Sequence, residues 1–152
     1  MVPQQLIQTF IPCQLHEKID ILFSFVRKHL KSKIICFVST MKQVSFLTKI
    51  LRQMAIGIKV FGLSGGMSQN VRREQYESFC GARSALMIAT DVAARGLDFP
   101  RIDLVFQLDL PISTAVYIHR IGRTARNHAH GRSISLVMPQ EKEFLDMLHK
   151  AN

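Results

Sequence analysis

Three arginines recur at every third position of the stretch YIHRIGRTAR, Tyr117–Arg126. With about 3.6 residues per helical turn, Arg120 and Arg123 lie near one side of the helix that this stretch predicts. Gly122 tends to end that helix, so that Arg123 and Arg126 extend from its terminus. Taken alone, a basic helix end is most often only solvated.

The neighbours of these arginines favour a phosphate clamp over a solvated helix end. His119 precedes the last two arginines, and the small Ala125 lies between them. This composition suits arginines that reach from outside to the phosphates of a ligand. Arginines of this kind stabilise charge on a phosphoryl group during its transfer and accelerate the reaction about a thousandfold or more. The chain has no Gly-Lys-Ser/Thr sequence of a P-loop. A nucleotide that meets this clamp must therefore be held by another domain.

Three loops that follow predicted strands are rich in small residues, hydroxyls and backbone amides: Ser39–Met41, Gly62–Gln69 and Thr90–Pro100. In an open parallel sheet, ligands bind at the edge where the carboxyl ends of the strands meet, because loops and helix N-termini gather there. These loops suit a phosphate backbone lying across that edge. For Gly62–Gln69 alone, a tight turn followed by a helix N-cap at Ser68 is the simpler interpretation.

The helix predicted over 68–80 carries Gln69, Arg72 and Arg73 in its first turn and a half. Arginines near a helix start work against the helix dipole unless an anion lies nearby. Such arginines are also often simply exposed to solvent, so this signal is weak when taken alone.

The segment TDVAARGLD places Asp91, Arg95 and Asp98 in a short loop directly after a buried strand. Charges in such a place are costly unless they pair with one another or meet a ligand. An ion pair of Arg95 with Asp91 or Asp98 is the structural alternative to a ligand site.

The elements that must position these residues alternate along the chain. Apolar residues at helical spacing predict helices over 15–31, 41–54, 68–80, 113–121 and 141–150. Short apolar runs rich in branched and aromatic residues predict strands over 33–38, 58–63, 84–90, 103–109 and 132–139. This succession, with short connecting loops, predicts an α/β fold in which helices cover both faces of a mainly parallel sheet.

The composition predicts one basic, soluble domain. The 152 residues are enough for one sizeable core but too few for two ordinary domains. Lysine and arginine number 20 against 11 acidic residues, for a formal charge of +9 that favours a polyanionic partner such as nucleic acid or nucleotide phosphates. No apolar run is long enough to span a bilayer.

The cysteines and histidines do not predict a metal site. Cys13, Cys36 and Cys80 are not spaced as zinc ligands, so we expect reduced thiols and an intracellular protein. His128 and His130 form a short His-Ala-His in a polar loop, which is a weak metal candidate at most.

Four motifs together resemble the C-terminal RecA-like domain of DEAD-box ATP-dependent RNA helicases. They are IICFVST, SQNVRREQYESF, TDVAARGLD and YIHRIGRTAR, which match that family's motifs IV, IVa, V and VI in order and in spacing. The resemblance covers nearly the whole chain from Leu6 onward. It implies a RecA-like three-layer sandwich, with residues 14–152 as one domain and residues 1–13 as either the end of a linker or a first strand.

The resemblance implies roles by position. Arg123 and Arg126 match arginines that reach the γ-phosphate of ATP bound on the N-terminal domain, and Asp98 matches the aspartate that contacts the ATP ribose. His119 and Arg120 match residues that couple this contact across the cleft between the domains. The positions that match the family's RNA track are Ser39, Thr40, Gly65, Gln69, Arg72, Thr90 and Asp91.

Two positions depart from the family pattern. Ser64 stands where the family often has histidine, which alters one hydrogen bond on the RNA side without removing the backbone contact of Gly65. Ala125 stands where motif VI commonly has glycine, as in some members that resemble ribosome-assembly helicases. The family's Q motif, P-loop, DEAD box and SAT motif are missing from the sequence. We therefore expect half of an enzyme, with ATP and Mg²⁺ held mainly by an N-terminal domain.

The predicted function is that of the C-terminal lobe of an ATP-dependent RNA helicase, which binds single-stranded RNA through its sugar-phosphate backbone. Two alternatives are a non-catalytic RNA-binding module with the same fold and the trailing lobe of a DNA translocase. The expected partners are RNA and the N-terminal RecA-like domain of the same protein, with no membrane. Alone, the chain is expected to be monomeric and inactive. The resemblance suggests a nuclear or nucleolar setting in ribosome biogenesis, with the cytoplasm as the alternative.

Overall fold

A computed structural model describes residues 5–125 and 130–151, within which six strands form one sheet. The strands are β1 (Leu6–Pro12), β2 (Lys33–Phe37), β3 (Val60–Leu63), β4 (Ala85–Ala89), β5 (Leu104–Gln107) and β6 (Gly131–Val137). The α-helices are α1 (Lys18–Arg27), α2 (Met41–Gln53), α3 (Gln69–Gly81), α4 (Asp91–Ala94), α5 (Thr114–Ile121) and α6 (Lys142–Ala151). Short 3-10 helices, Leu15–Glu17 and Pro139–Glu141, precede α1 and α6.

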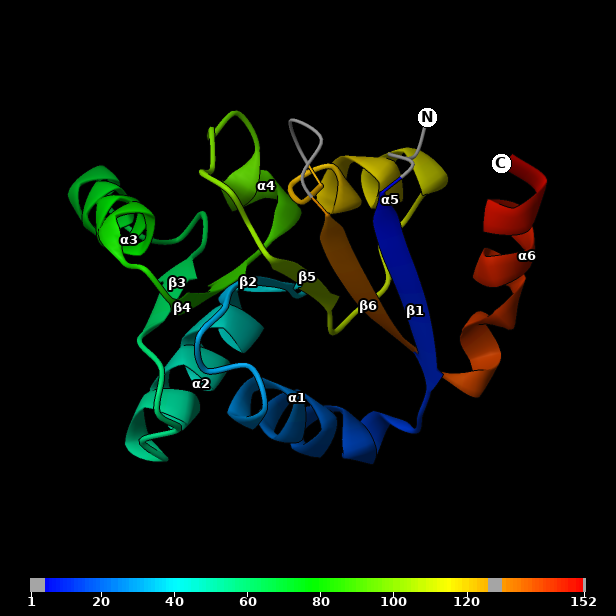
Figure 1. Ribbon diagram of the computed structural model, residues 1–152, viewed down its shortest axis with the longest axis horizontal. Coiled ribbons are helices and arrows are strands. Elements are labelled where there is room, and N and C mark those ends of the chain that lie inside the picture. The colour runs from blue at the N-terminus through cyan, green and yellow to red at the C-terminus, as the bar shows by residue number, and fades with distance from the viewer. Residues whose placement is uncertain (1–4, 126–129, 152) are drawn as a thin grey trace.

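Every strand pairing in the sheet is parallel, and the strand order is β1-β6-β5-β2-β4-β3 (Figure 1). Strand β2 lies in the interior, where Cys36 pairs with Phe106 of β5 and with Ile88 of β4. The predicted α/β fold with a parallel sheet is confirmed. Because parallel strands all point the same way, the loops that follow β2, β3, β4 and β5 meet at one edge.

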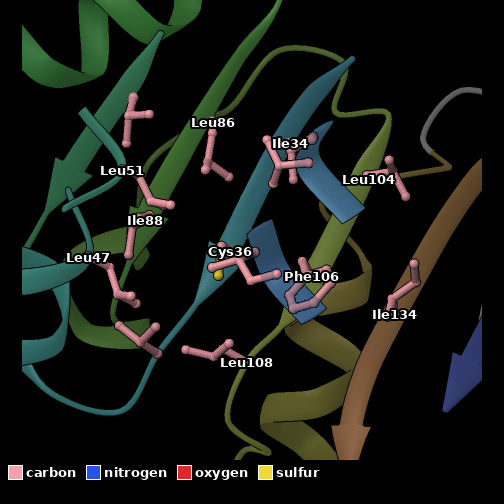
Figure 2. Close-up of a cluster of buried hydrophobic side chains, with 14 of the residues drawn as sticks. Ile34, Cys36, Leu47, Leu51, Leu86, Ile88, Leu104, Phe106, Leu108 and Ile134 are labelled. Atoms are coloured by element: carbon pink, nitrogen blue, oxygen red, sulfur yellow. The ribbon is translucent and has the colours of Figure 1, made fainter. Parts of the chain in front are cut away.

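Helices α1 and α2 cover one face of the sheet. Alternate residues of a strand point to opposite faces, so Ile34 and Cys36 face this layer while Ile35 faces the other. Figure 2 shows the core on this side, with Leu47 and Leu51 of α2 packed over the sheet. The four side chains on this side, Ile34, Cys36, Leu47 and Leu51, are at most 2% exposed, so the helices cover this face of the sheet closely.

Helices α3, α4, α5 and α6 cover the opposite face (Figure 1). Phe79 of α3 and Ala93 of α4 pack against the centre of the sheet. Tyr117 of α5 and Leu148 of α6 pack near the edge formed by β1. Since both faces are covered, all residues of β2, β4 and β5 are buried, which explains why their sequences are mostly apolar.

The helices that begin at the carboxyl edge of the sheet start with hydroxyl N-caps. Thr40 caps α2, Ser68 caps α3, Thr90 caps α4 and Ser113 caps α5. Each side-chain oxygen accepts a hydrogen bond from the backbone N–H three residues further along, at 3.1 to 3.3 Å. The N-cap interpretation of Ser68 is therefore confirmed.

Beyond small shifts at element ends, the structure changes the sequence-based prediction in two places, and in a third it decides between a linker and a first strand at the N-terminus. Residues 91–94, expected to be a loop, form α4, which at four residues is too short to show helical periodicity. Leu6–Pro12 forms strand β1, which pairs with β6 along its whole length. The helix expected over 15–31 is divided into a 3-10 turn and α1, which ends at Arg27.

Within the described residues, no helix has the length and apolar character needed to cross a membrane. The same residues contain no cluster of three or more His, Cys, Asp or Glu side chains that could hold a metal ion. Cys13, Cys36 and Cys80 are free thiols. Burial raises the pKa of Cys36 to about 12, so this thiol is a core residue rather than a reactive group.

Candidate functional site

The neighbouring strands β2, β4 and β3 bring the predicted RNA-track residues onto one rim of the sheet. Ser39 and Thr40 follow β2, Thr90 follows β4, and Gly65 and Gln69 follow β3. Thr90 is buried, whereas the other four are exposed. Backbone bonds join the strand ends beneath them, and one of these runs from the amide of Thr90 to the loop end of β3 at 3.4 Å. We call this strip, together with Arg72 and Asp91, the rim.

The turn at Ser39 and Thr40 is fixed by Gln43. Its Oε1 accepts hydrogen bonds from the backbone amides of Ser39, at 3.1 Å, and of Thr40, at 2.8 Å. The prediction that backbone amides are available here is wrong for this turn, because both amides are used internally. The hydroxyl of Thr40 is also used internally, because it donates to Oε1 of Gln43 at 3.0 Å, so the turn offers a ligand the exposed side chain of Ser39 instead.

Asp109, which is not among the predicted site residues, anchors the same turn. Its Oδ1 accepts from Nζ of Lys18 at 2.9 Å, and its Oδ2 accepts from the amide of Ser39 at 3.1 Å and from Nε2 of Gln43 at 2.7 Å. Burial alone would raise the pKa of Asp109, but the hydrogen bond and charge of Lys18, helped by the other two donors, lower it below its ordinary value. Asp109 is thus a charged anchor beneath the rim.

The position of Asp109 in the sequence could have marked it as a site residue. Asp91 was selected because a charge directly after a buried strand is costly unless it is paired, and Asp109 follows the buried strand β5 in the same way. Lys18 gave no such signal, because a lysine at the start of a predicted helix is normally exposed. Its side chain is 5% exposed in the structure.

Arg72 reaches from α3 to α4. Its Nη2 donates to the carbonyl oxygen of Ala93 at 3.3 Å, while its Nε is buried with no hydrogen-bond partner in the described part of the chain. A cavity of about 260 Å³ lies beside it, lined in part by Gln69, Arg73 and Tyr76. Buried polar groups are normally satisfied, whereas the guanidinium of Arg72 has one donor left unused within the described part of the domain.

Arg120 is enclosed within the domain. It is 1% exposed, and its Nε and Nη2 donate to Oδ1 and Oδ2 of Asp91, each at 2.7 Å. Its Nη1 donates to Oε1 of Gln107 at 3.1 Å and to the carbonyl oxygen of Asp109 at 2.7 Å. The guanidinium carbon also lies 5.0 Å from the ring centre of Phe37. These contacts make Arg120 a positioning residue for the start of α4.

The alternative to a ligand site in the segment after β4 was an ion pair of Arg95 with Asp91 or Asp98. The described residues do not form that pair. The ion pair of Asp91 is with Arg120 of α5 rather than with Arg95, which is exposed. Sequence separation explains the miss, because the pair joins residues 29 apart that only the parallel sheet brings together.

A second group of predicted residues gathers around Arg123. Its Nη1 donates to the carbonyl oxygen of Leu97 at 2.7 Å, and its Nη2 lies 3.1 Å from Nε2 of His119. The guanidinium carbon is 5.7 Å from the ring centre of Phe99, and the residue is 5% exposed. Asp98 lies between Leu97 and Phe99 and is itself exposed. The structure therefore brings together Asp98, His119 and Arg123, which we call the Arg123 group.

The surroundings of the Arg123 group are also held in place. The hydroxyl of Tyr76 donates to the backbone carbonyl oxygen of Asp98. Ala125, where the resembling family commonly has glycine, has a φ of 56°, in the left-handed region that favours glycine. Arg126 and His128 lie outside the described residues.

Helix α4 connects the two groups. Thr90 and Asp91 of the rim stand at its start, and the segment that carries Asp98 follows its end. The rim combines hydroxyls, a guanidinium and a carboxylate, which suit the backbone of a nucleic acid. The Arg123 group combines a preoriented guanidinium with an exposed carboxylate, which suits a nucleotide.

Comparisons with known proteins show the family to which this fold belongs. Residues 17–128 match the family described as the helicase conserved C-terminal domain. The crystal structure of the E. coli DEAD-box protein SrmB, bound to regulator of ribonuclease activity A, is similar with a TM-score of 0.85 and 32% identity, over 98% of this chain and 87% of that one. The chain belongs to the helicase conserved C-terminal domain family and is of the DEAD-box type.

Individual relatives refine this picture. The chain is 46% identical over 141 residues to a probable ATP-dependent RNA helicase, ddx10, of Dictyostelium discoideum, which covers 93% of the chain and 16% of that protein. The structure of Mss116p DEAD-box helicase domain 2 bound to an RNA duplex has a TM-score of 0.86 and 31% identity, over 97% of this chain and 59% of that one. The chain thus spans a small part of the full-length helicases that it matches.

Proposed function

We propose that the chain is the C-terminal lobe of an ATP-dependent RNA helicase. It binds single-stranded RNA along the rim and presents Arg123 and Arg126 to ATP held by an N-terminal lobe. The main support for this proposal is that α4 separates the rim from the Arg123 group. One lobe therefore has two distinct polar sites. The RNA-bound domain of Mss116p and the name of the Dictyostelium relative support it.

At the rim, each residue type suits a part of the RNA backbone. The guanidinium of Arg72 suits a phosphate, since it carries a charge and an unsatisfied N–H. The hydroxyl of Thr90 accepts from the amide of Ala93 at 3.3 Å, and accepting that bond does not use the proton of the hydroxyl, which remains a donor for phosphate oxygen. The half-buried carboxylate of Asp91 accepts hydrogen bonds only, so it suits a 2′-hydroxyl rather than a phosphate.

At the Arg123 group, the chain's own residues suit a nucleotide bound from outside. When bound on the other lobe, ATP with Mg²⁺ supplies the phosphoryl group that is transferred to water. Arg123 is held by Leu97 and His119, so its charge is oriented before the nucleotide arrives, which is the condition for stabilising a transition state. Asp98 can accept a hydrogen bond from a ribose hydroxyl. Arg126 supplies the second guanidinium.

A joined protein tests this function. The chain alone should show negligible RNA-stimulated ATP turnover, and fusion to its N-terminal lobe should restore it. In the fusion, Arg126→Ala should reduce turnover by about a hundredfold or more while changing RNA affinity little. Substantial turnover by the chain alone, or equal losses of turnover and RNA affinity, would contradict the proposal.

The setting of the protein in the cell stays a prediction. We propose a nuclear or nucleolar location and a role in ribosome biogenesis for the full-length protein, and a monomeric state for this chain alone. Imaging of the tagged full-length protein tests the location, and light scattering of the purified chain tests the monomer.

A further inference from the structure

A groove of about 480 Å³ lies where α2 meets the loop that follows β3. Its lining includes Met41, Lys42, Phe46 and Lys49 of α2 and Gly66 of the loop. None of these residues belongs to the rim or to the Arg123 group. Its volume lies within the range of about 300–1,000 Å³ that ligand pockets occupy, so it is large enough for one nucleotide.

The floor of the groove is apolar and exposed. Phe46 is 53% exposed and Met41 is 52% exposed, although the other face of α2 is fully buried through Val44, Leu47 and Leu51. A single exposed apolar side chain needs no explanation, but here two of them share one hollow. The aromatic ring of Phe46 gives this hollow a flat apolar surface.

The border of the groove is basic. Lys42 and Lys49 lie four residues before and three residues after Phe46, so all three side chains share one side of the helix. Among the described residues that line the groove, none is acidic. Lysine is depleted in the cores of protein–protein interfaces, whereas lysines beside an aromatic ring are typical of sites that bind single-stranded nucleic acid.

The groove is continuous with the rim. Met41 directly follows Thr40 in the chain, and Gly66 directly follows Gly65. The helix and the loop also lie against each other, because a Cβ added at Gly66 would come within 3.3 Å of Sδ of Met41. A strand that runs over Thr40 and Gly65 would therefore reach the groove next.

We propose that this groove binds a further nucleotide of the RNA strand, with its base stacked on Phe46 and its phosphates beside Lys42 and Lys49. The inference rests on the proposed function, since it extends the RNA track of the rim. Stacking on a ring is tolerant of sequence because every base has a flat face, so the groove lengthens the site without adding base specificity. The partner is single-stranded RNA rather than a protein.

Binding of fluorescein-labelled oligouridylates of about 4 to about 16 nucleotides to the 152-residue chain tests this proposal by fluorescence anisotropy. We expect Phe46→Ala to weaken binding of the longer RNAs by about fivefold or more and to leave the shortest unaffected. Phe46→Tyr keeps the ring and should retain wild-type affinity. Lys49→Ala should lower the slope of log affinity against log salt by about 0.7.

Two controls lie on α6, at the other end of the molecule from α2 (Figure 1). Lys150→Ala removes the same charge as Lys49→Ala, and Met147→Ala removes an exposed apolar side chain like that of Phe46. Neither should change affinity as the groove variants do. Circular dichroism shows whether each variant is folded. We expect the Phe46 variants to be folded, because the side chain of Phe46 is exposed.

The outcomes separate this proposal from the proposed function. If Phe46→Ala leaves every RNA length unaffected while Arg72→Ala weakens binding, the RNA track holds and the groove proposal is overturned, which leaves the groove to a protein partner. If no RNA binds at any length, both are overturned. A length-dependent loss in Phe46→Ala with rescue by Phe46→Tyr supports the groove.

Discussion

Arg120 and Asp91 are joined by two parallel hydrogen bonds of 2.7 Å, which tie helix α5 to the first residue of α4. The side chain of Arg120 is 2% exposed and that of Asp91 is 28% exposed, so the pair lies at the boundary of the core with its carboxylate toward the rim. Arg120 and Arg123 stand three residues apart in the same motif, but they make different contacts. Arg120 is a structural element of the domain, whereas Arg123 belongs to the Arg123 group.

Replacing Arg120 should destabilise the fold. Arg120→Ala leaves Asp91 without its partner and removes donors from Gln107 and Asp109, so we expect a loss of about 3 kcal/mol in the free energy of unfolding. Arg120→Lys keeps the charge but cannot bridge both carboxylate oxygens, so it should recover only part of the loss. Urea denaturation followed by circular dichroism measures both variants, since the chain has no tryptophan.

Arg101→Ala is the matched control for that prediction. The side chain of Arg101 is 74% exposed, and its ion pair with Asp103 has a distance of 3.9 Å. Exposed pairs of this kind contribute about 0–1 kcal/mol, so stability should hardly change. If Arg101→Ala and Arg120→Ala lower the free energy of unfolding equally, the bonds of Arg120 to Asp91 contribute no more to stability than an exposed ion pair does.

Asp109 predicts a pH dependence of stability. Its folded-state pKa is lowered, so its stabilising contribution is fully present above the unfolded pKa of about 3.9 and is lost as the pH falls through the folded-state pKa. Asp109→Asn removes this carboxylate and leaves Lys18 buried without its charged partner, at a cost of about 2–3 kcal/mol at neutral pH. The difference in unfolding free energy between the wild type and Asp109→Asn should shrink as the pH falls below about 4.

Urea titrations at a series of pH values measure that difference. Asp146→Asn, on the exposed side of α6, removes the same charge and should leave the pH profile close to that of the wild type. A difference between the wild type and Asp109→Asn that stays constant down to about pH 2 would contradict the assignment.

Much of the fold could be predicted from the sequence because its signals are local. The buried runs of β2 and β4 and the apolar face of α2 are each visible within a short window, and each formed near its expected bounds. Helix α4 was missed because four residues hold too little periodicity. Strand β1 was left open because it lies at the edge of the sheet and its exposure alternates.

Only those residues of the candidate site that adjacent residues in the sequence make recognisable could be predicted. Thr90 and Asp91 stand directly after a buried strand, and the arginines of Tyr117–Arg126 stand in a recognisable motif. The partners that hold them are distant in the chain, as Lys18 is from Asp109, 91 residues away. Such pairs depend on which strands become neighbours, and no local pattern encodes that.

Arg72→Ala should weaken RNA binding while leaving the fold intact. The loss of one charge-assisted contact predicts about a tenfold lower affinity, and the salt dependence should fall by about 0.7 in log–log slope. Fluorescence anisotropy with oligouridylate at several salt concentrations measures both. Arg83→Ala, an exposed arginine just after α3, removes the same charge away from the rim and should change affinity much less. Identical losses in the two variants would remove Arg72 from the RNA track.

Ala125→Gly should stabilise the domain. Ala125 has a φ of 56°, and a residue with a Cβ loses about 1–2 kcal/mol in that left-handed conformation, whereas glycine does not. The greater freedom of glycine in the unfolded chain offsets about 0.4–1 kcal/mol of this gain. A net gain of roughly 0.5–1 kcal/mol corresponds to an increase of about 1–4 °C in Tm for a chain of this size. Ala115→Gly makes the same change in the first turn of α5, where it should lower stability by up to about 1 kcal/mol. Thermal unfolding of the two variants therefore predicts shifts of opposite sign, and a decrease in both would show that Ala125 is not strained.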